Sequence, residues 1–302
     1  MAFKMVEPTF SPTSFSVQHQ FYNWVYQGQS LTIAYDILGQ GSPVLLLPAF
    51  STVSSRTELA GIVQILSPHF QVIALDWLGF GESDRPRIQY DRALYQQLLQ
   101  DFVRDRCPHP LAIVAAGHAA GYAIQLAQRQ PSLCSKLLLV APTWKGPFRA
   151  MGAPSPVASG VRHLVRSPLL GQALYALNTH PAFLKWMYQR HVYVDGDKLT
   201  PDFMTVKHQI TQQPGARFAP AAFVTGGLDP MGDREEWLRV GRSLTMPVKA
   251  IVPEQAPPKS KAEMEAFTAL PHIQEQRVSG TLGAYEEYAV DVGHIALEFL
   301  HN

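Results

Sequence analysis

The sequence predicts an α/β protein whose mostly parallel central sheet carries helices on both sides. Short apolar runs alternate with amphipathic segments in the first half of the chain and again near its end, which is typical of successive strand–helix–strand units. The runs are apolar almost throughout, as expected of strands buried on both faces of a parallel sheet. Residues 144–245 interrupt this alternation with many prolines, glycines and helical segments, and this stretch is interpreted as a helical insertion.

Each expected element follows from its pattern of apolar residues. Residues 21–26 and 31–37 flank the polar turn QGQS and are expected to pair as strands. Residues 1–20 are expected to form an irregular arm, since proline, serine and threonine are frequent there. The core is expected over residues 21–143 and 246–302, and a helical cap over residues 144–245. Further strands are expected at 43–49, 71–77, 111–117, 136–142, 247–253 and 272–278, and helices at 55–66, 93–107, 118–130, 260–270 and 284–300.

Composition argues against several classes of protein. The formal net charge is +1 and no long run of one sign occurs, so a nucleic-acid surface is not expected. Cys107 and Cys134 lack the spacing of a disulfide framework or a zinc site, and no metal or cofactor is expected. No apolar run approaches the ~20 residues that span a bilayer, and the first residues lack the apolar segment of a secretory signal. A cytoplasmic protein with no membrane span is expected.

Four segments carry a family resemblance: PVLLLPAF (43–50), DWLGFGESDRP (76–86), GHAAGYAIQLAQRQP (117–131) and KLLLVAPT (136–143). Together they resemble the α/β-hydrolase fold superfamily, in the style of its capped epoxide hydrolases, dehalogenases and small esterases. The second segment is the most specific signal. The resemblance implies an α/β-hydrolase fold with a helical cap. It also implies a nucleophile on a strand-to-helix elbow, an acid and a histidine.

The expected nucleophile is replaced. The family pattern G-x-S-x-G falls on Gly117-His118-Ala119-Ala120-Gly121, with Ala119 at the position of the serine. An alanine methyl group has neither a lone pair nor a proton to give, so covalent catalysis from Ala119 is excluded. His118 precedes this position, and a structural role is expected for it.

The acid and histidine positions are replaced as well. In the family pattern the acid falls on Ala256 and the histidine on Thr281, or on Leu282 if the register slips by one. Because a laboratory change of the serine would leave the other two residues in place, three replacements indicate a naturally non-catalytic chain. Fallback acids are Glu254, which is two residues early, and Asp229, interpreted as a turn or helix-cap residue. The downstream histidine, His294, is interpreted as a packed or surface residue within a helix.

The resemblance also implies pocket residues. The backbone amides of Phe50 and Ala120 correspond to the oxyanion hole, and Trp144 begins the cap. Asp76 and Ser83 are expected to make structural hydrogen bonds. A cap over a floor of alanines would enclose an apolar site for a small ligand. Arg162, His163 and Arg166 are interpreted as a solvated face, with an acidic partner or a membrane surface as the alternative. Large apolar residues of the cap are expected in its core: Leu169, Leu170, Leu174, Trp186, Met187 and Tyr188.

Three functional hypotheses remain at this point. The favoured one is a non-catalytic α/β-hydrolase-fold protein that binds an apolar small molecule or a protein partner. The alternative is an enzyme with relocated or non-hydrolytic chemistry, drawing on His118, Asp229, Glu254 or Thr281. The third is a purely structural or interaction module whose pocket is filled by its own side chains. A histidine and a carboxylate within hydrogen-bond reach of one another, both opening on the pocket, would favour the second hypothesis. A collapsed cavity above Ala119, together with a large exposed apolar patch elsewhere, would favour the third.

Overall fold

The predicted α/β-hydrolase fold is confirmed. The computed structural model describes residues 17–152, 160–162, 164–165, 167 and 169–302. Their strands form one sheet in the order β1-β2-β4-β3-β5-β6-β7-β8. The pairs β1–β2 and β2–β4 are antiparallel and the others are parallel. The strands are β1 (Gln18–Tyr26), β2 (Gln29–Leu38), β3 (Pro43–Leu47), β4 (Gln71–Leu75), β5 (Leu111–Ala116), β6 (Cys134–Val140), β7 (Val248–Pro253) and β8 (Ile273–Val278).

The first strand begins earlier than expected. Residues 18–20 pair with β2, with Gln18 opposite Ile37, so they belong to the sheet and not to an irregular arm. Their side chains are polar and exposed, which is why the apolar pattern did not reveal them. Residues 1–16 lie outside the described part of the chain.

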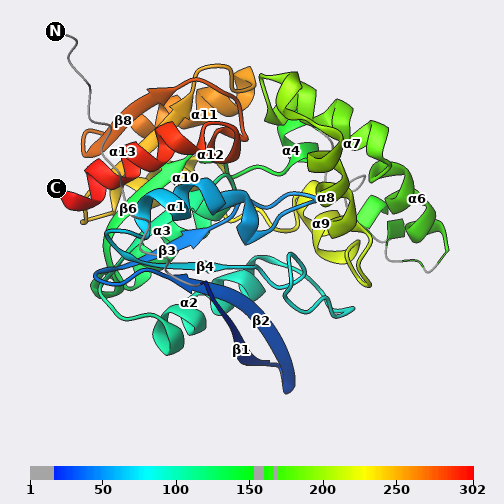
Figure 1. Cartoon of the computed structure of the whole chain (residues 1–302), viewed down its shortest axis with the longest axis horizontal. Coiled ribbons are helices and arrows are strands. Elements are labelled where there is room, and N and C mark those ends of the chain that lie inside the picture. Colours follow the sequence, from blue (N-terminus) through cyan, green and yellow to red (C-terminus); the bar gives the residue numbers. More distant parts are fainter. Residues whose placement is uncertain (1–16, 153–159, 163, 166, 168) are drawn as a thin grey trace, which may run out of the picture.

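Helices cover both faces of the sheet (Figure 1). Alternate residues of β3 point to opposite faces: Leu45 packs with α2, α3 and α10, and Leu46 packs with α1 and α13. Buried side chains on both faces explain why the central parallel strands are nearly continuous apolar runs in the sequence, whereas the edge strand β8 is mostly exposed. The bounds are α1 (Ala60–Leu66), α2 (Arg92–Arg106), α3 (Ala119–Arg129), α10 (Arg234–Arg242), α11 (Pro258–Thr268), α12 (Ala284–Glu287) and α13 (Ala289–His301).

Further helices lie between β6 and α10 and gather at one end of the sheet (Figure 1). Tyr188, Tyr193 and Met204 form a small core there, together with Val53 from the loop after β3. This region agrees with the expected helical insertion, whereas its boundaries as a separate unit stay a prediction. The bounds are α4 (Pro147–Met151), α6 (Leu170–Asn178), α7 (Pro181–Met187), the π-helical turn η3 (Tyr188–Val192), α8 (Pro201–Thr211) and α9 (Phe218–Val224).

Most of the large apolar residues expected in the core of the cap are exposed. Tyr188 is buried and Met187 is half-buried. The expectation is wrong for the other four, whose exposed fractions are 85% for Leu169, 63% for Leu170, 41% for Leu174 and 50% for Trp186.

The basic residues near the start of the cap are only partly described. Arg162 is half-buried, because its guanidinium donates to the hydroxyl and the carbonyl of Thr225. It is therefore not a solvated charge. His163 and Arg166 lie outside the described residues.

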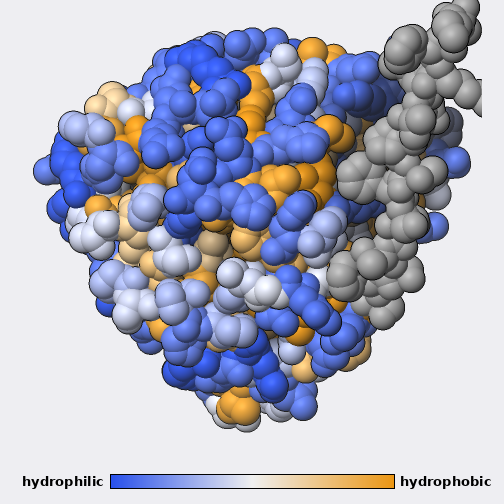
Figure 2. Space-filling view, turned by 60° about the vertical axis from the view of Figure 1, so that its left-hand side comes forward, coloured by the Kyte–Doolittle hydropathy of each residue, from blue (hydrophilic) through white to orange (hydrophobic). Residues whose placement is uncertain are grey.

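Several surface and chemical properties complete the fold. On the face shown in Figure 2, hydrophilic residues cover most of the surface, with apolar residues between them. Among the described residues, no helix is long and apolar enough to cross a membrane, and no cluster of histidine, cysteine and acidic residues that could hold a metal is found. Cys107 and Cys134 are free and buried, and burial raises the pKa of both thiols to about 12.

Candidate functional site

The strand-to-helix elbow lies at Gly117. β5 ends at Ala116 and α3 begins at Ala119, and Gly117 between them has a φ of +52°. In the family, the nucleophile occupies the sharp, strained turn between strand and helix. A positive φ is the mark of that turn, and glycine adopts it without strain. The structure therefore places the elbow at Gly117, two residues before Ala119.

Ala119 is a helical residue with no exposed surface. The sequence register pointed to it because glycines flank it on both sides. The second of these, Gly121, serves packing: a Cβ at Gly121 would lie 2.2 Å from Cγ of Pro230. The amide of Ala120, expected as an oxyanion donor, donates instead to the carbonyl of Gly117, at 3.2 Å.

The elbow has no room for a side chain. A Cβ built on Gly117 would lie 2.9 Å from Cβ of Ala49, which is closer than real Cβ atoms approach. Ala49 follows β3, in the loop that provides one of the oxyanion amides in the family. Gly117 and Ala49 therefore fit one another, and neither offers a nucleophile.

The loop after β3 is filled by aromatic rings. Phe50, expected at the oxyanion hole, is buried. Its ring centroid lies 5.0 Å from Trp77, 4.9 Å from Tyr95 and 6.4 Å from Phe223 on α9. Ala119 and Ala120 below have no exposed surface. Phe50, Ala119 and Ala120 belong to one buried cluster, so side chains of the described residues fill the interior around these alanines.

Ala256, at the expected acid position, and Thr281, at the expected histidine position, are both buried. Ala256 packs with Ala141, Val252 and Met264. The Thr281 hydroxyl donates to the carbonyl of His191, at 3.0 Å. Glu254 is exposed, and its carbonyl accepts from the ammonium of Lys261, at 2.9 Å.

A buried histidine–carboxylate pair lies beside the elbow. The Nε2 of His118 is 3.1 Å from Oδ1 of Asp229, and these side chains are 1% and 2% exposed. The Nδ1 of His118 is 3.2 Å from the hydroxyl of Thr143, which follows β6. The pair is within the hydrogen-bond reach that the second hypothesis requires, but both side chains are buried among the described residues and do not open on a pocket. The sequence predicted a structural role for His118 and a turn or helix-cap role for Asp229. The residue that caps α10 is Asp233, which accepts from the amide of Glu236.

Asp229 is well compensated for its burial. Besides His118, its carboxylate accepts from the amide of Gly146 at 2.7 Å and from the guanidinium of Arg149 at 2.7 Å. A buried carboxylate is stable only with such partners. It thereby fastens α4 and the loop after β6 to the turn that precedes α10.

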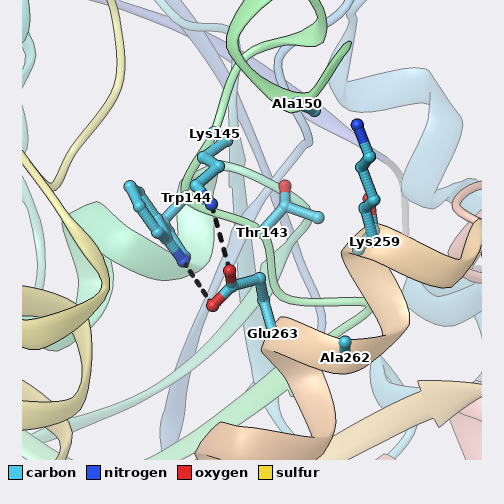
Figure 3. Close-up of a pocket in the computed structure, with 8 residues that line it drawn as sticks. Thr143, Trp144, Lys145, Ala150, Lys259, Ala262 and Glu263 are labelled. Atoms are coloured by element: carbon cyan, nitrogen blue, oxygen red, sulfur yellow. Dashed lines mark hydrogen bonds and ion pairs between the residues drawn. The ribbon is translucent and has the colours of Figure 1, made fainter. Parts of the chain in front are cut away.

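Thr143, the last residue in this series of hydrogen bonds, lines a cavity. A cavity of about 210 Å³ lies between the loop after β6 and the first turns of α11 (Figure 3). Within it, Glu263 accepts from the indole of Trp144 at 3.3 Å and from Lys145 at 3.0 Å. Trp144, expected in a pocket with Phe50, Ala119 and Ala120, lines this cavity without those three residues. The lining residues are Thr143, Trp144, Lys145, Ala150, Lys259, Ser260, Ala262 and Glu263.

Two further charged groups are structural. Asp76 accepts from the amide and guanidinium of Arg56, and its carbonyl accepts from the Ser83 hydroxyl at 2.8 Å. The structural roles expected of Asp76 and Ser83 agree with these bonds. A second group joins α8, one of the helices between β6 and α10, to the rest of the fold: Lys207 on α8 lies 3.0 Å from Glu58 and 2.7 Å from Glu286. Burial and the nearby Glu286 raise the pKa of Glu58, although Lys207 opposes the rise.

The sheet order and the strand-to-helix elbow define a protein of α/β-hydrolase type. A model of the alpha/beta hydrolase family matches residues 44–299, most of the chain. The chain therefore belongs to the alpha/beta hydrolase family.

Individual relatives are more distant. An uncharacterized protein of Mycobacterium bovis is 34% identical over 108 residues, which are 36% of this chain and 31% of that protein. The match thus spans less than a third of that relative. Among solved structures, a serine hydrolase involved in carbazole degradation has a TM-score of 0.72 and 17% identity, covering 95% of this chain and 99% of that one. A thermophilic esterase from Thermogutta terrifontis has a TM-score of 0.71 and 18% identity, covering 94% and 98%. These structures show the fold.

Proposed function

We propose that this protein uses the α/β-hydrolase fold without covalent hydrolysis and acts by binding a small molecule. The observation that carries the proposal is the elbow, where Gly117 faces the methyl group of Ala49 and leaves no space for a nucleophile. Ala256 and Thr281 also support the proposal, because an alanine cannot orient a histidine and a threonine hydroxyl cannot act as the general base. Loss of triad residues typically lowers the rate by a factor on the order of 10⁴–10⁶.

The cavity beside Thr143 is the proposed binding site. Ligands of open α/β sheets bind beyond the carboxyl ends of the strands, and Thr143 and Trp144 follow the carboxyl end of β6. Trp144, Ala150 and Ala262 give apolar walls, and the exposed Lys259 supplies a cation. These walls suit a small molecule with an apolar body and an anionic group. A protein partner is the other occupant to test, because the filled interior around Ala119 and the exposed apolar residues of α6 and α7 also fit an interaction module. The free thiols Cys107 and Cys134 support a reducing, cytoplasmic location.

Two measurements test this proposal. Purified protein is incubated with chromogenic esters, epoxides and haloalkanes, and the expected rates equal those of the blank. Small molecules that co-purify are identified by native mass spectrometry and titrated back into the wild type and the Lys259→Met and Lys261→Met variants. Lys259→Met should weaken binding, and the neighbouring Lys261→Met should not. Turnover that follows the purified protein would refute the non-catalytic proposal, and equal binding by both variants would refute the site.

Relocated chemistry is a second candidate, favoured by the hydrogen-bonded series Asp229–His118–Thr143. A carboxylate, an imidazole and a hydroxyl in series can activate the hydroxyl as a nucleophile, and here the hydroxyl lines a cavity. A fluorophosphonate probe, which loses fluoride to an activated hydroxyl, distinguishes the candidates by intact mass. The binding proposal predicts no adduct. An adduct on Thr143 that disappears in both Thr143→Val and His118→Gln would establish the second candidate.

A further inference from the structure

One face of α6 is apolar and faces solvent. Leu170, Leu174 and Leu177 stand at positions i, i+4 and i+7, on one side of the helix, and their exposed fractions are 63%, 41% and 71%. Tyr175, on the opposite side, is buried at 6% exposed. The helix therefore packs on the protein with its tyrosine side and presents its leucines outward.

The neighbouring helix continues this surface. On α7 the rings of Phe183 and Trp186 lie 5.5 Å apart and are 37% and 50% exposed, whereas Leu184 is buried. Leu169, just before α6, is 85% exposed. Both helices lie at the outer end of the cap, away from the sheet (Figure 1). We refer to Leu169, Leu170, Leu174, Leu177, Phe183 and Trp186 as the cap apolar face.

The fully charged residues on α7 and η3, two of the helices that carry or border this face, are all positive. The sequence from residue 144 to residue 194 contains no aspartate or glutamate, and its fully charged residues are lysines and arginines. Lys185 and Arg190 are exposed on α7 and η3, and the Arg190 guanidinium lies 5.7 Å from the Trp186 ring centroid. Acidic residues resume at Asp195 and Asp197, and Asp202 lies in the first turn of α8, which packs against α7.

We propose that the cap apolar face docks on the surface of an anionic lipid bilayer. Leucine, phenylalanine and tryptophan side chains on one side of short helices enter the boundary between headgroups and acyl chains. Exposed lysine and arginine beside them attract anionic headgroups. The combination of exposed leucines, an aromatic pair and the positive charges of Lys185 and Arg190 matches an anionic lipid surface. The contact lies at the interface and needs no membrane span, and it does not depend on the proposed ligand site.

Vesicle co-sedimentation of the full chain tests the proposal. Vesicles of phosphatidylcholine alone are compared with vesicles that also contain phosphatidylglycerol, at low and at high salt. We expect binding to the anionic vesicles and loss of binding at high salt. Lys185→Gln and Arg190→Gln should each weaken binding by about fivefold, and Leu174→Gln combined with Leu177→Gln should abolish it.

A matched control distinguishes binding by the cap apolar face from nonspecific hydrophobic adsorption to vesicles. Val290 on α13 is also apolar and 61% exposed, so Val290→Gln should bind vesicles like the wild type. Circular dichroism and thermal unfolding confirm that each variant is folded. The proposal is overturned if neutral and anionic vesicles bind equally, or if Val290→Gln weakens binding as much as the leucine variant. It is also overturned if no vesicle binds and light scattering shows self-association that the leucine variant abolishes, since the face then belongs to a second copy of the chain.

Discussion

His118 and Asp229 are 111 positions apart in the chain, yet their Nε2 and Oδ1 atoms lie 3.1 Å apart in the buried interior. The contact connects the elbow after β5 to the turn between α9 and α10. Because Asp229 also binds Gly146 and Arg149, one carboxylate holds together three segments distant in the sequence.

Replacement of Asp229 by alanine is expected to destabilise the fold by about 3 kcal/mol. The change leaves the Gly146 amide and the His118 ring without their buried acceptor, and such groups are costly to leave unpaired. Urea unfolding measures the effect. Asp233→Ala is the control, because Asp233 only caps α10 and its loss should cost about 1 kcal/mol. Equal losses in the two variants would contradict a special role for Asp229.

Gly117→Ala is expected to destabilise the protein by more than about 2 kcal/mol. The residue has a positive φ, and the new methyl group would collide with Ala49; backbone strain of this kind costs about 1–3 kcal/mol by itself. Gly28→Ala isolates the strain, because Gly28 has a φ of +77° and a Cβ added there would meet no atom within 4 Å.

A double-mutant cycle then measures the collision. In an Ala49→Gly background, the cost of Gly117→Ala should fall to about that of Gly28→Ala. If the cost is the same with alanine or glycine at position 49, the collision is not the cause.

Neither Ala119→Ser nor Gly117→Ser in the Ala49→Gly background is expected to restore esterase activity. A serine hydroxyl is a poor nucleophile without an adjacent base, and Thr281 and Ala256 occupy the base and acid positions. The measurement is p-nitrophenyl ester hydrolysis with burst analysis. A burst of acyl-enzyme followed by turnover in either variant would reveal a base and refute the non-catalytic proposal.

The free energy of unfolding of the Glu58→Gln variant, relative to that of the wild type, is expected to rise as pH rises. The pKa of Glu58 is raised in the folded protein, chiefly by burial. Folding therefore gains from its protonation at low pH and loses that gain as pH rises from the ordinary glutamate range through the raised value. Glutamine cannot ionise, so the free energy of unfolding of the variant relative to the wild type should rise over this range. Glu298→Gln, at an exposed site on α13, should show little pH dependence, and a flat difference for Glu58→Gln would contradict the expectation.

The sequence predicted the centre of the sheet well because burial on both faces leaves a nearly continuous apolar run in the central parallel strands, as in Leu45, Leu46 and Leu47 of β3. It did not place the elbow, because Gly117 and Gly121 are equivalent in a pattern and only backbone angles show which one turns the chain. The contact of His118 with Asp229 could not be predicted from the sequence either, since no local pattern connects residues on distant loops. Helical periodicity identified the leucines of α6 but did not tell whether another element covers them.

The fit between Gly117 and Ala49 also bears on how the fold can change over time. A nucleophile at the elbow requires that the small residue after β3 be reduced to glycine first, a step that by itself confers no activity. The opposite order passes through a strained and crowded intermediate. Even after both steps, the sites now held by Ala256 and Thr281 would still lack an acid and a base. Once Ala49 and Gly117 are packed against one another, single substitutions therefore lead away from hydrolysis more easily than back to it.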